Sequence, residues 1–125
     1  MTIIYNRQKI VVVAAELDWN TSSFEVGVMI AASIPSGSRF VVARLFVQTQ
    51  FNAGTTNTLK IGYAAGGGEL IPVTSIGVAA NTFIDLPTAW SVNPLSAERA
   101  LYATYTQSGT AASAGKVHVN LIAVL

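Results

Sequence analysis

The sequence contains no cysteine and little charge. Without cysteine, the chain has neither a disulfide framework nor a thiolate metal site. Charged residues make up 10% of the 125 residues, against roughly 25% in an average globular domain. The formal net charge of +1 excludes a strong electrostatic attraction to nucleic acid or to anionic lipid. We therefore expect no nucleic-acid partner.

Long apolar runs are also missing. The run 10–15 ends at Glu16, far short of the ~20 apolar residues of a membrane helix. At the start of the sequence, Ile3 and Ile4 precede the basic residues Arg7 and Lys9, which reverses the order found in a secretory signal. We therefore expect a protein that is made in a cytoplasm, carries no export signal and does not enter a membrane.

Apolar residues are abundant instead: they make up 51% of the chain, and the mean hydropathy is +0.50. In the stretch 48–69, Lys60 and Glu69 supply the charge, and the other polar residues are threonine, asparagine and glutamine. One interpretation is an apolar core beneath a neutral, hydroxyl-rich surface. The other is a subunit that hides part of its outside against neighbours, because a stable monomer tends to need surface charge. We favour the second and expect a homo-oligomer.

The hydrophobic pattern indicates β-structure throughout. Short runs rich in β-favouring residues are separated by glycine and proline turns, which is typical of sandwiches, jelly rolls and barrels. The runs are 9–17, 25–32, 39–49, 58–64, 81–86, 100–107 and 116–124. Residues 96–101 could instead form a helical turn or two. We predict an all-β, single-domain antiparallel β-sandwich, jelly-roll-like, with about seven to eight strands over 9–125 and an N-terminal arm at 1–8.

Alternation along the longest run, 39–49, gives its two sides different characters. One side is wholly apolar and is formed by Val41, Ala43, Leu45 and Val47. The other side carries Arg44 and Phe46, and we expect Phe46 to pack beneath a second layer. In the run 25–32, Val26, Val28 and Ile30 share one side.

The only histidine, His118, lies inside a predicted strand. Its neighbours Val117 and Val119 are expected to face the core, so His118 faces the other way. A serine nucleophile paired with this histidine would need a sharp Gly-x-Ser-x-Gly turn, which the sequence lacks. We predict no catalytic residue and assign His118 a structural or interface role.

Metal and phosphate sites are also considered. Glu16, Asp18 and Asn20 alternate and would point the same way in an extended chain, but calcium takes six to eight oxygens and no glycine-bearing calcium loop follows. The triglycine 66–68 does not open a helix, so it is not a phosphate-binding loop. We predict neither a metal nor a cofactor.

Candidate contact residues are apolar or aromatic. Burying the apolar arm residues against a neighbour would remove a liability in water, and aromatic residues are frequent interface anchors. The candidates are Ile3, Ile4, Tyr5 and Arg7 in the arm, and Trp19, Phe51 and Trp90 in the domain. Trp19 and Trp90 could alternatively stack on a saccharide.

Three stretches of the sequence resemble small structural proteins of tailed-bacteriophage virions. They are Ile34-Pro35-Ser36-Gly37-Ser38, the segment 51–62 (FNAGTTNTLKIG) and the ending, with 101–111 (LYATYTQSGTA) and 114–119 (AGKVHV). The resemblance covers roughly residues 34–125. It implies a jelly-roll-like sandwich that oligomerises and decorates or cements a capsid, with the major capsid protein as partner and the capsid surface as location.

Two alternatives stay open. The resemblance also fits a tail or fibre module that binds a receptor saccharide through Trp19 or Trp90. A hydrolase built on a β-sandwich is the third class, and the lone histidine makes it the weakest. The copy number in the particle separates the first two, since hundreds of copies indicate the head and a handful the tail.

Overall fold

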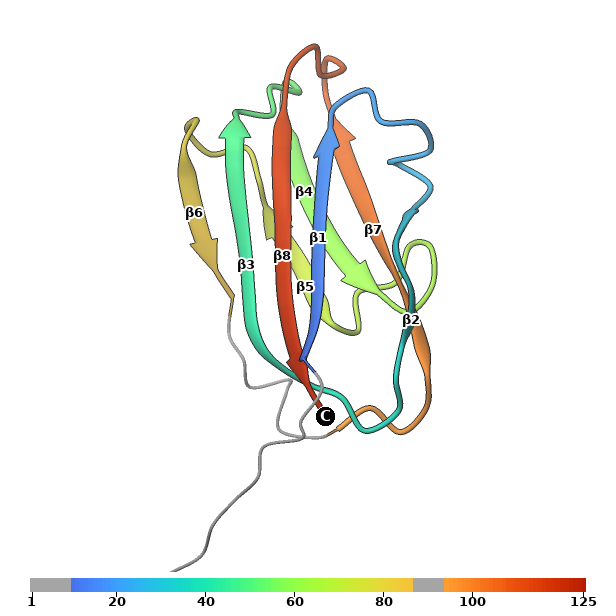
Figure 1. The fold of residues 1–125 in the computed structure, drawn as a ribbon. Helices are drawn as coiled ribbons and strands as arrows, with labels where there is room; N and C mark the ends of the chain where they lie inside the picture. Colours follow the sequence, from blue (N-terminus) through green and yellow to red (C-terminus); the bar gives the residue numbers. More distant parts are fainter. Residues whose placement is uncertain (1–9, 87–93) are drawn as a thin grey trace, which may run out of the picture.

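The structure, a computed structural model, describes residues 10–86 and 94–125. These residues form eight β-strands and no helix (Figure 1). The strands are β1 (Ile10–Asp18), β2 (Val28–Ile34), β3 (Arg39–Thr49), β4 (Thr56–Gly62), β5 (Ile71–Ser75), β6 (Thr82–Asp85), β7 (Arg99–Ser108) and β8 (Lys116–Val124). The all-β prediction and its count of strands are confirmed, and the helical alternative at 96–101 is wrong.

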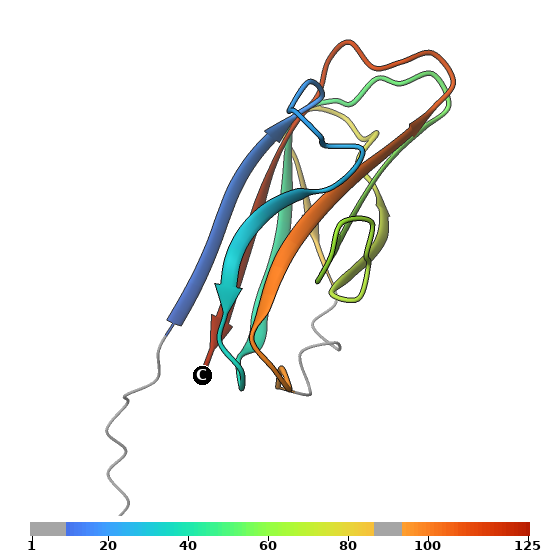
Figure 2. The ribbon, with the colours of Figure 1, turned by 90° about the vertical axis from the view of Figure 1, so that its right-hand side faces the viewer.

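The strands form two four-stranded antiparallel sheets. Their orders are β1-β8-β3-β6 and β2-β7-β4-β5. The first sheet faces the viewer in Figure 1, and Figure 2 shows both layers from the side. The first strand pairs with the last, the second with the seventh and the fourth with the fifth, so the chain is rolled up from its ends. This nested order is that of a jelly roll, which confirms the predicted sandwich.

The core lies between the two sheets and follows from simple alternation along each strand. On β8, Val117 and Val119 are fully buried, as predicted, and Leu121 is buried with them. On β7, Leu101 and Tyr105 are buried in the same way. Valine and other β-branched residues suit this half-buried pleated surface, which is why the strongest patterns in the sequence became the central strands.

A β-bulge moves the apolar side of β3. The register of β3 against β8 shifts between Phe40 and Val42, so Phe40 is buried and Val41 is 46% exposed. The prediction that Val41 shares a buried side with Leu45 is therefore wrong, because one extra residue reverses the alternation. Beyond the bulge, Leu45 and its neighbours on that side are buried as expected.

Two further predictions about strands need correction. β2 begins at Val28, and Val26 lies in the preceding turn with 69% of its surface exposed. β5 was not predicted because Pro72 interrupts its short pattern. Proline is tolerated there because β5 is an edge strand, where one side of the backbone needs no partner.

Phe51 is the centre of a buried cluster at the end of the sandwich where β3 and β7 finish. Its ring is 1% exposed and packs 5.1 Å from the ring of Tyr105 and 6.4 Å from that of Phe24. A Cβ at Gly115 would overlap the Phe51 ring. The expectation that Phe51 makes contacts outside the subunit is corrected by this burial, since its side chain has no exposed surface to offer.

Hydrogen bonds complete this cluster. The Tyr105 hydroxyl donates to Asn57 Oδ1 at 2.6 Å, and the Asn57 side-chain amide donates to the carbonyl of Ala53 at 3.2 Å. Burial, with a smaller effect from Glu25, raises the pKa of Tyr105 to about 12. Nearby, the backbone amides of Ser113 and Ala114 donate to Asn52 Oδ1. Much of the sequence that carries the resemblance therefore builds the interior and loops of this end.

Candidate functional site

The outer face of the β1-β8-β3-β6 sheet is the candidate site. Cross-strand partners lie on the same side of a sheet, so the pairing register gives its layout. Val12 lies opposite Ile122, which in turn lies opposite Val42. Further along the strands, His118 lies opposite Phe46, which lies opposite Phe83. The face therefore has an apolar end, where β1 begins, and a mixed aromatic and polar end.

The apolar end carries a patch of aliphatic side chains, with the exposed Arg39 at its border opposite Val124. Ile10 and Val12 are 65% and 64% exposed, and the bulge leaves Val41 and Val42 exposed beside them. We call this group the apolar patch; its members are Ile10, Val12, Val41, Val42, Ile122 and Val124. Isolated exposed apolar residues are ordinary, but a contiguous group marks a surface that binds something.

The other end of the face is held by ion pairs and ring contacts. Arg44 Nε lies 2.6 Å from Asp85 Oδ1, and the Arg44 guanidinium also lies over the Phe83 ring. The Phe46 and Phe83 rings lie 4.6 Å apart. Phe46 is half-buried by these neighbours in its own sheet, so the prediction that it packs beneath a second layer is wrong within the described residues.

His118 has a polar partner on this outer face of the sheet. Its side chain faces outward, as predicted, and Nε2 lies 2.7 Å from Gln48 Oε1. On the same strand, Lys116 Nζ lies 3.0 Å from Glu16 Oε1 of β1, and this hydrogen bond, with the charge of Lys116, lowers the pKa of Glu16. Among residues 10–86 and 94–125, this arrangement pairs side chains on a surface, and the hydrogen-bond partner of His118 is Gln48, not a serine.

A shallow hollow of about 250 Å³ lies between the two ends of the face. It exists because Ala14 is small where its neighbours on β1 are large, and Asn120, His118 and Glu16 form its polar walls. The hollow is open to solvent on the exposed edge of the sheet. It continues the apolar patch and has no enclosed volume for a small molecule.

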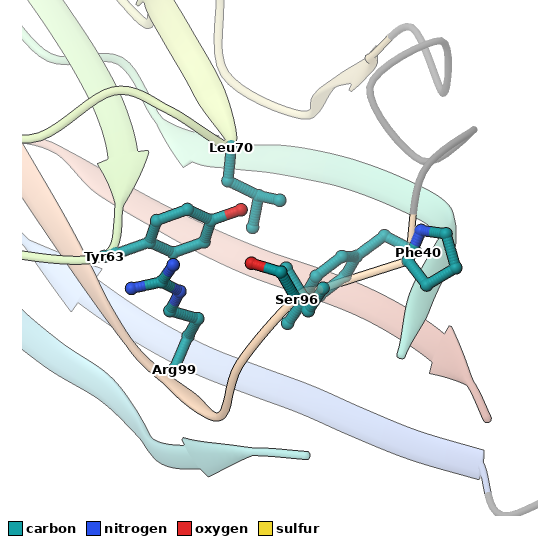
Figure 3. Close-up of a pocket in the computed structure, with 7 residues that line it drawn as sticks. Phe40, Tyr63, Leu70, Ser96 and Arg99 are labelled. Carbon is teal, nitrogen blue, oxygen red and sulfur yellow. The ribbon is translucent and has the colours of Figure 1, made fainter. Parts of the chain in front are cut away.

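A second hollow, of about 200 Å³, is lined from both sheets, by Phe40 of β3 and by Arg99 of β7 among others. Arg99 places its guanidinium 4.9 Å from the centre of the Tyr63 ring, which Figure 3 shows beside Leu70 and Ser96. The stacked cation and the serine hydroxyl could bind an anionic group. Pro94, which also lines this hollow, adjoins the residues that the structure does not describe.

The outer face of the β2-β7-β4-β5 sheet is different in character. Thr56 and Ser108 share a hydrogen bond of 2.6 Å across β4 and β7, and Thr58 lies opposite Thr106. Hydroxyl groups thus occupy positions where most soluble sheets carry lysine or glutamate. This face contributes to the low charge of the chain, whereas the outer face of the β1-β8-β3-β6 sheet carries the Arg44–Asp85 and Lys116–Glu16 pairs.

The predicted site residues have different outcomes. Trp19 is 41% exposed in the turn after β1, and its backbone amide donates to the carbonyl of Gly115. Trp19 lines neither hollow. The remaining candidates, Trp90 and the arm residues Ile3, Ile4, Tyr5 and Arg7, lie outside the described residues.

The alternating acids at the end of β1 have local partners. Asp18 Oδ1 accepts hydrogen bonds from the backbone amide of Asn20 and the hydroxyl of Thr21, while Glu16 binds Lys116. No group of three potential metal ligands occurs in 10–86 or 94–125. That part of the chain also has no helix long and apolar enough to cross a membrane.

Comparison with known proteins gives matches in structure. No family model matches the sequence, and no curated protein matches it. A chain in the capsid asymmetric unit of cyanophage Pam1 aligns with a TM-score of 0.65 at 12% identity, covering 100% of this chain and 91% of that one. A chain in the acid-stable capsid of Helicobacter pylori bacteriophage KHP30 aligns with a TM-score of 0.63 at 15% identity, covering 94% and 93%. A chain in the capsid of Ralstonia phage GP4 aligns with a TM-score of 0.56 at 19% identity, covering 99% of this chain and 90% of that one.

This is a fold found in phage capsids. At these identities the likeness is one of fold, and it agrees with the fold implied by the resemblance of residues 34–125. The likeness spans nearly the whole of each capsid chain, so those chains are barely larger than this one domain.

Sequence reasoning missed the apolar patch. Val12 belongs to the run 10–15, in which both sides are apolar, so its pattern does not separate core from surface. The outward side of β8 is polar at Lys116, His118 and Asn120, and Ile122 lies near its end. The signal that could have revealed the patch was the lack of polar alternation in 10–15, together with the position of β1 at the edge of its sheet.

Proposed function

We propose that this protein is a non-enzymatic structural component of a bacteriophage virion, which oligomerises and decorates or cements the capsid. The observation that carries the proposal is the likeness of fold to chains in three phage capsids, over 94–100% of this chain. Its partners would be other copies of itself and the major capsid protein, and its place the capsid surface.

The size of the chain supports a role as a subunit that attaches to the capsid shell. The capsid chains that it matches are covered to 90–93%, so each is close to a single jelly roll. A domain of 13.1 kDa with an exposed apolar patch has a surface suited to binding a larger lattice. We infer that it attaches to the shell, which larger subunits form.

The uncharged surface supports lasting contact with protein. Hydroxyl and amide groups can pair across an interface without the large desolvation cost of burying a charge. The Thr56–Ser108 pair and the neighbouring threonines present such groups on one face. The apolar patch presents aliphatic side chains on the other, where burial contributes on the order of 1 kcal/mol for each half-exposed side chain.

The surroundings of His118 support a non-enzymatic role. Its Nε2 lies within hydrogen-bond distance of Gln48 Oε1. The nearest acids on the face, Glu16 and Asp85, form ion pairs with Lys116 and Arg44. The saccharide-binding tail module depended on Trp19 and Trp90. Trp19 stands outside both hollows, so no observation favours that alternative, and it becomes an outcome of the test.

The copy number of the chain in purified virions tests the proposal. Quantitative mass spectrometry of separated heads and tails should find the chain in heads, at a fixed ratio to the major capsid protein and in hundreds of copies per particle. A handful of copies confined to tails would support the tail module instead. Absence from the virion would overturn the proposal.

A further inference from the structure

The β1 strand is an edge without the usual protection. An exposed edge strand offers free backbone groups to another chain, and proteins normally guard it with short length, proline, a bulge or charge. Three of the four edge strands in the described part of the chain are guarded: β6 has four residues, β5 contains Pro72, and β2 has two register shifts. β1 instead runs for nine residues in unbroken register with β8, and its first six residues carry no charge.

The hydrogen bonds at the end of β1 show which of its backbone groups are free. The amide of Trp19 donates to the carbonyl of Gly115 at 3.0 Å, and this pair continues the register of β1 on β8. Bonded and non-bonded pairs alternate along an antiparallel ladder. The pair before it, Asp18 and Lys116, is therefore non-bonded, and the Asp18 amide donates to Thr21 Oγ1 at 2.9 Å instead.

The same alternation continues back along β1. The amides and carbonyls of Ile10, Val12, Ala14 and Glu16 point away from β8, toward the open edge. Within the described residues no other strand pairs with this edge, and Figure 2 shows β1, in blue, at the border of the sandwich. At about 3.4 Å per residue, these free groups span about 20 Å.

The hollow of the outer face lies beside this edge. Ala14 forms its floor, and Glu16, His118 and Asn120 form its polar walls. Cross-strand partners lie on the same side of a sheet, so a chain that paired with β1 would hold the side chain opposite Ala14 over the hollow. A long side chain with a polar end fits that position.

The charge at this end of the edge is negative. The charged side chains of β1 and β8 are Glu16, Asp18 and Lys116, so two carboxylates lie beside one ammonium group. A lysine or arginine from a partner would balance the remaining carboxylate. At the other end, Ile10 and Val12 are 65% and 64% exposed and suit aliphatic partners.

We propose that an extended segment of the major capsid protein adds to this edge as a fifth strand, antiparallel to β1 like every other pair in that sheet. The inference rests on the proposed function and deepens it by naming the surface that binds the shell. The segment carries lysine or arginine opposite Ala14, and aliphatic residues follow it at the second and fourth positions, opposite Val12 and Ile10. Backbone hydrogen bonds give such a contact its affinity, and the side chains give its specificity.

A second copy of β1 complements this edge less well. Residues 10–18 contain no basic residue. If two β1 strands paired antiparallel over all nine residues, Ile10 would lie opposite Asp18 and Val12 opposite Glu16. That pairing sets aliphatic side chains against carboxylates and leaves the charge unbalanced.

Hydrogen exchange tests whether the edge becomes paired. In the free protein the amides of Ile10, Val12, Ala14 and Glu16 should exchange faster than those of the residues between them, which are bonded to β8. On heads purified from particles that lack this chain and then saturated with it, mass spectrometry should find slower exchange at these four amides. Unchanged exchange along β1 in the bound protein overturns the proposal.

Substitutions on the edge test the same contact through affinity. Ala14→Pro removes one free amide and keeps a small side chain, and edge strands tolerate proline at such a position. Val12→Lys puts a cation where an aliphatic partner is expected. Each variant, folded by circular dichroism, should raise the dissociation constant for the heads about tenfold or more. If Ala14→Pro does not fold, Val12→Lys decides alone, and wild-type affinity in the folded variants overturns the proposal.

Val73→Lys is the matched control for Val12→Lys. Val73 is also 65% exposed, on the edge strand that Pro72 guards, so this variant should bind the heads as the wild type does. An equal loss of affinity in Val73→Lys and Val12→Lys would overturn the assignment to β1.

Photo-crosslinking identifies the occupant of the edge. Benzoylphenylalanine in place of Ile10, irradiated on the heads, should link to a segment of the major capsid protein that has the basic and aliphatic pattern. A link to a second copy of this chain, or to no protein, overturns the proposal. The copy number in virions is measured separately, so a chain abundant in heads whose β1 amides stay open would overturn this docking while the proposed function stands.

Discussion

Replacing Phe51 by alanine should cause a large loss of stability. The ring is 1% exposed and contacts the rings of Phe24 and Tyr105, while Gly115 leaves space for it by having no side chain. Truncation of a buried phenylalanine costs about 3–5 kcal/mol through lost burial and the cavity that remains. For a domain of this size, that corresponds to a fall of about 10–20 °C in Tm.

Phe83→Ala is the matched control. Phe83 is 61% exposed, and its contacts are with Phe46 and Arg44 on the surface of the sheet. We expect this variant to lose less than about 1 kcal/mol. Urea unfolding followed by circular dichroism measures both values. A loss below about 1 kcal/mol in Phe51→Ala, or equal losses in the two variants, would refute the reasoning that this cluster supports the end of the sandwich.

Three further predictions concern titration, surface packing and the arm. The folded protein holds the Tyr105 phenol proton more tightly than the unfolded chain, with a pKa of about 12 against about 10. The stability that this tighter proton binding adds is therefore complete below pH 10 and is lost between pH 10 and 12. Over that range the free energy of unfolding should fall more steeply in the wild type than in Tyr105→Phe, by up to about 1.4 kcal/mol per pH unit, and equal slopes would contradict the assignment. Phe46→Ala should lower Tm by only a few degrees in thermal melts, because Phe46 is half-buried on an outer face, and a loss as large as that of Phe51→Ala would show that a second layer covers it. Deletion of residues 2–8 should weaken self-association in sedimentation while Tm of the isolated subunit stays nearly unchanged; unfolding of the shortened subunit would show that the arm is a core strand.

The sequence predicted the strands whose patterns are regular. The bounds of β8 were predicted to the residue, and its alternation placed His118 on the outside, because nothing interrupts its period of two. Where the backbone departs from that period, the prediction failed. The bulge near Val41 and the proline in β5 are properties of pairing with another strand, which a local pattern does not contain.

The candidate site was harder to predict than the fold. Phe51 was predicted to be a contact residue because aromatic residues are frequent interface anchors, yet its ring is 1% exposed. Both sides of the run 10–15 are apolar, so its pattern does not show which side is core, and Val12 is 64% exposed in the structure. Exposure depends on which layer covers a strand, and this is decided by residues distant in sequence.

The most direct test of a role in the capsid is an electron-microscopy map of the virion at a resolution that separates strands. The account predicts many copies of a two-layered jelly roll on the outer surface of the shell, in contact with the major capsid protein. Density for this fold only in the tail, or in no part of the particle, would contradict it.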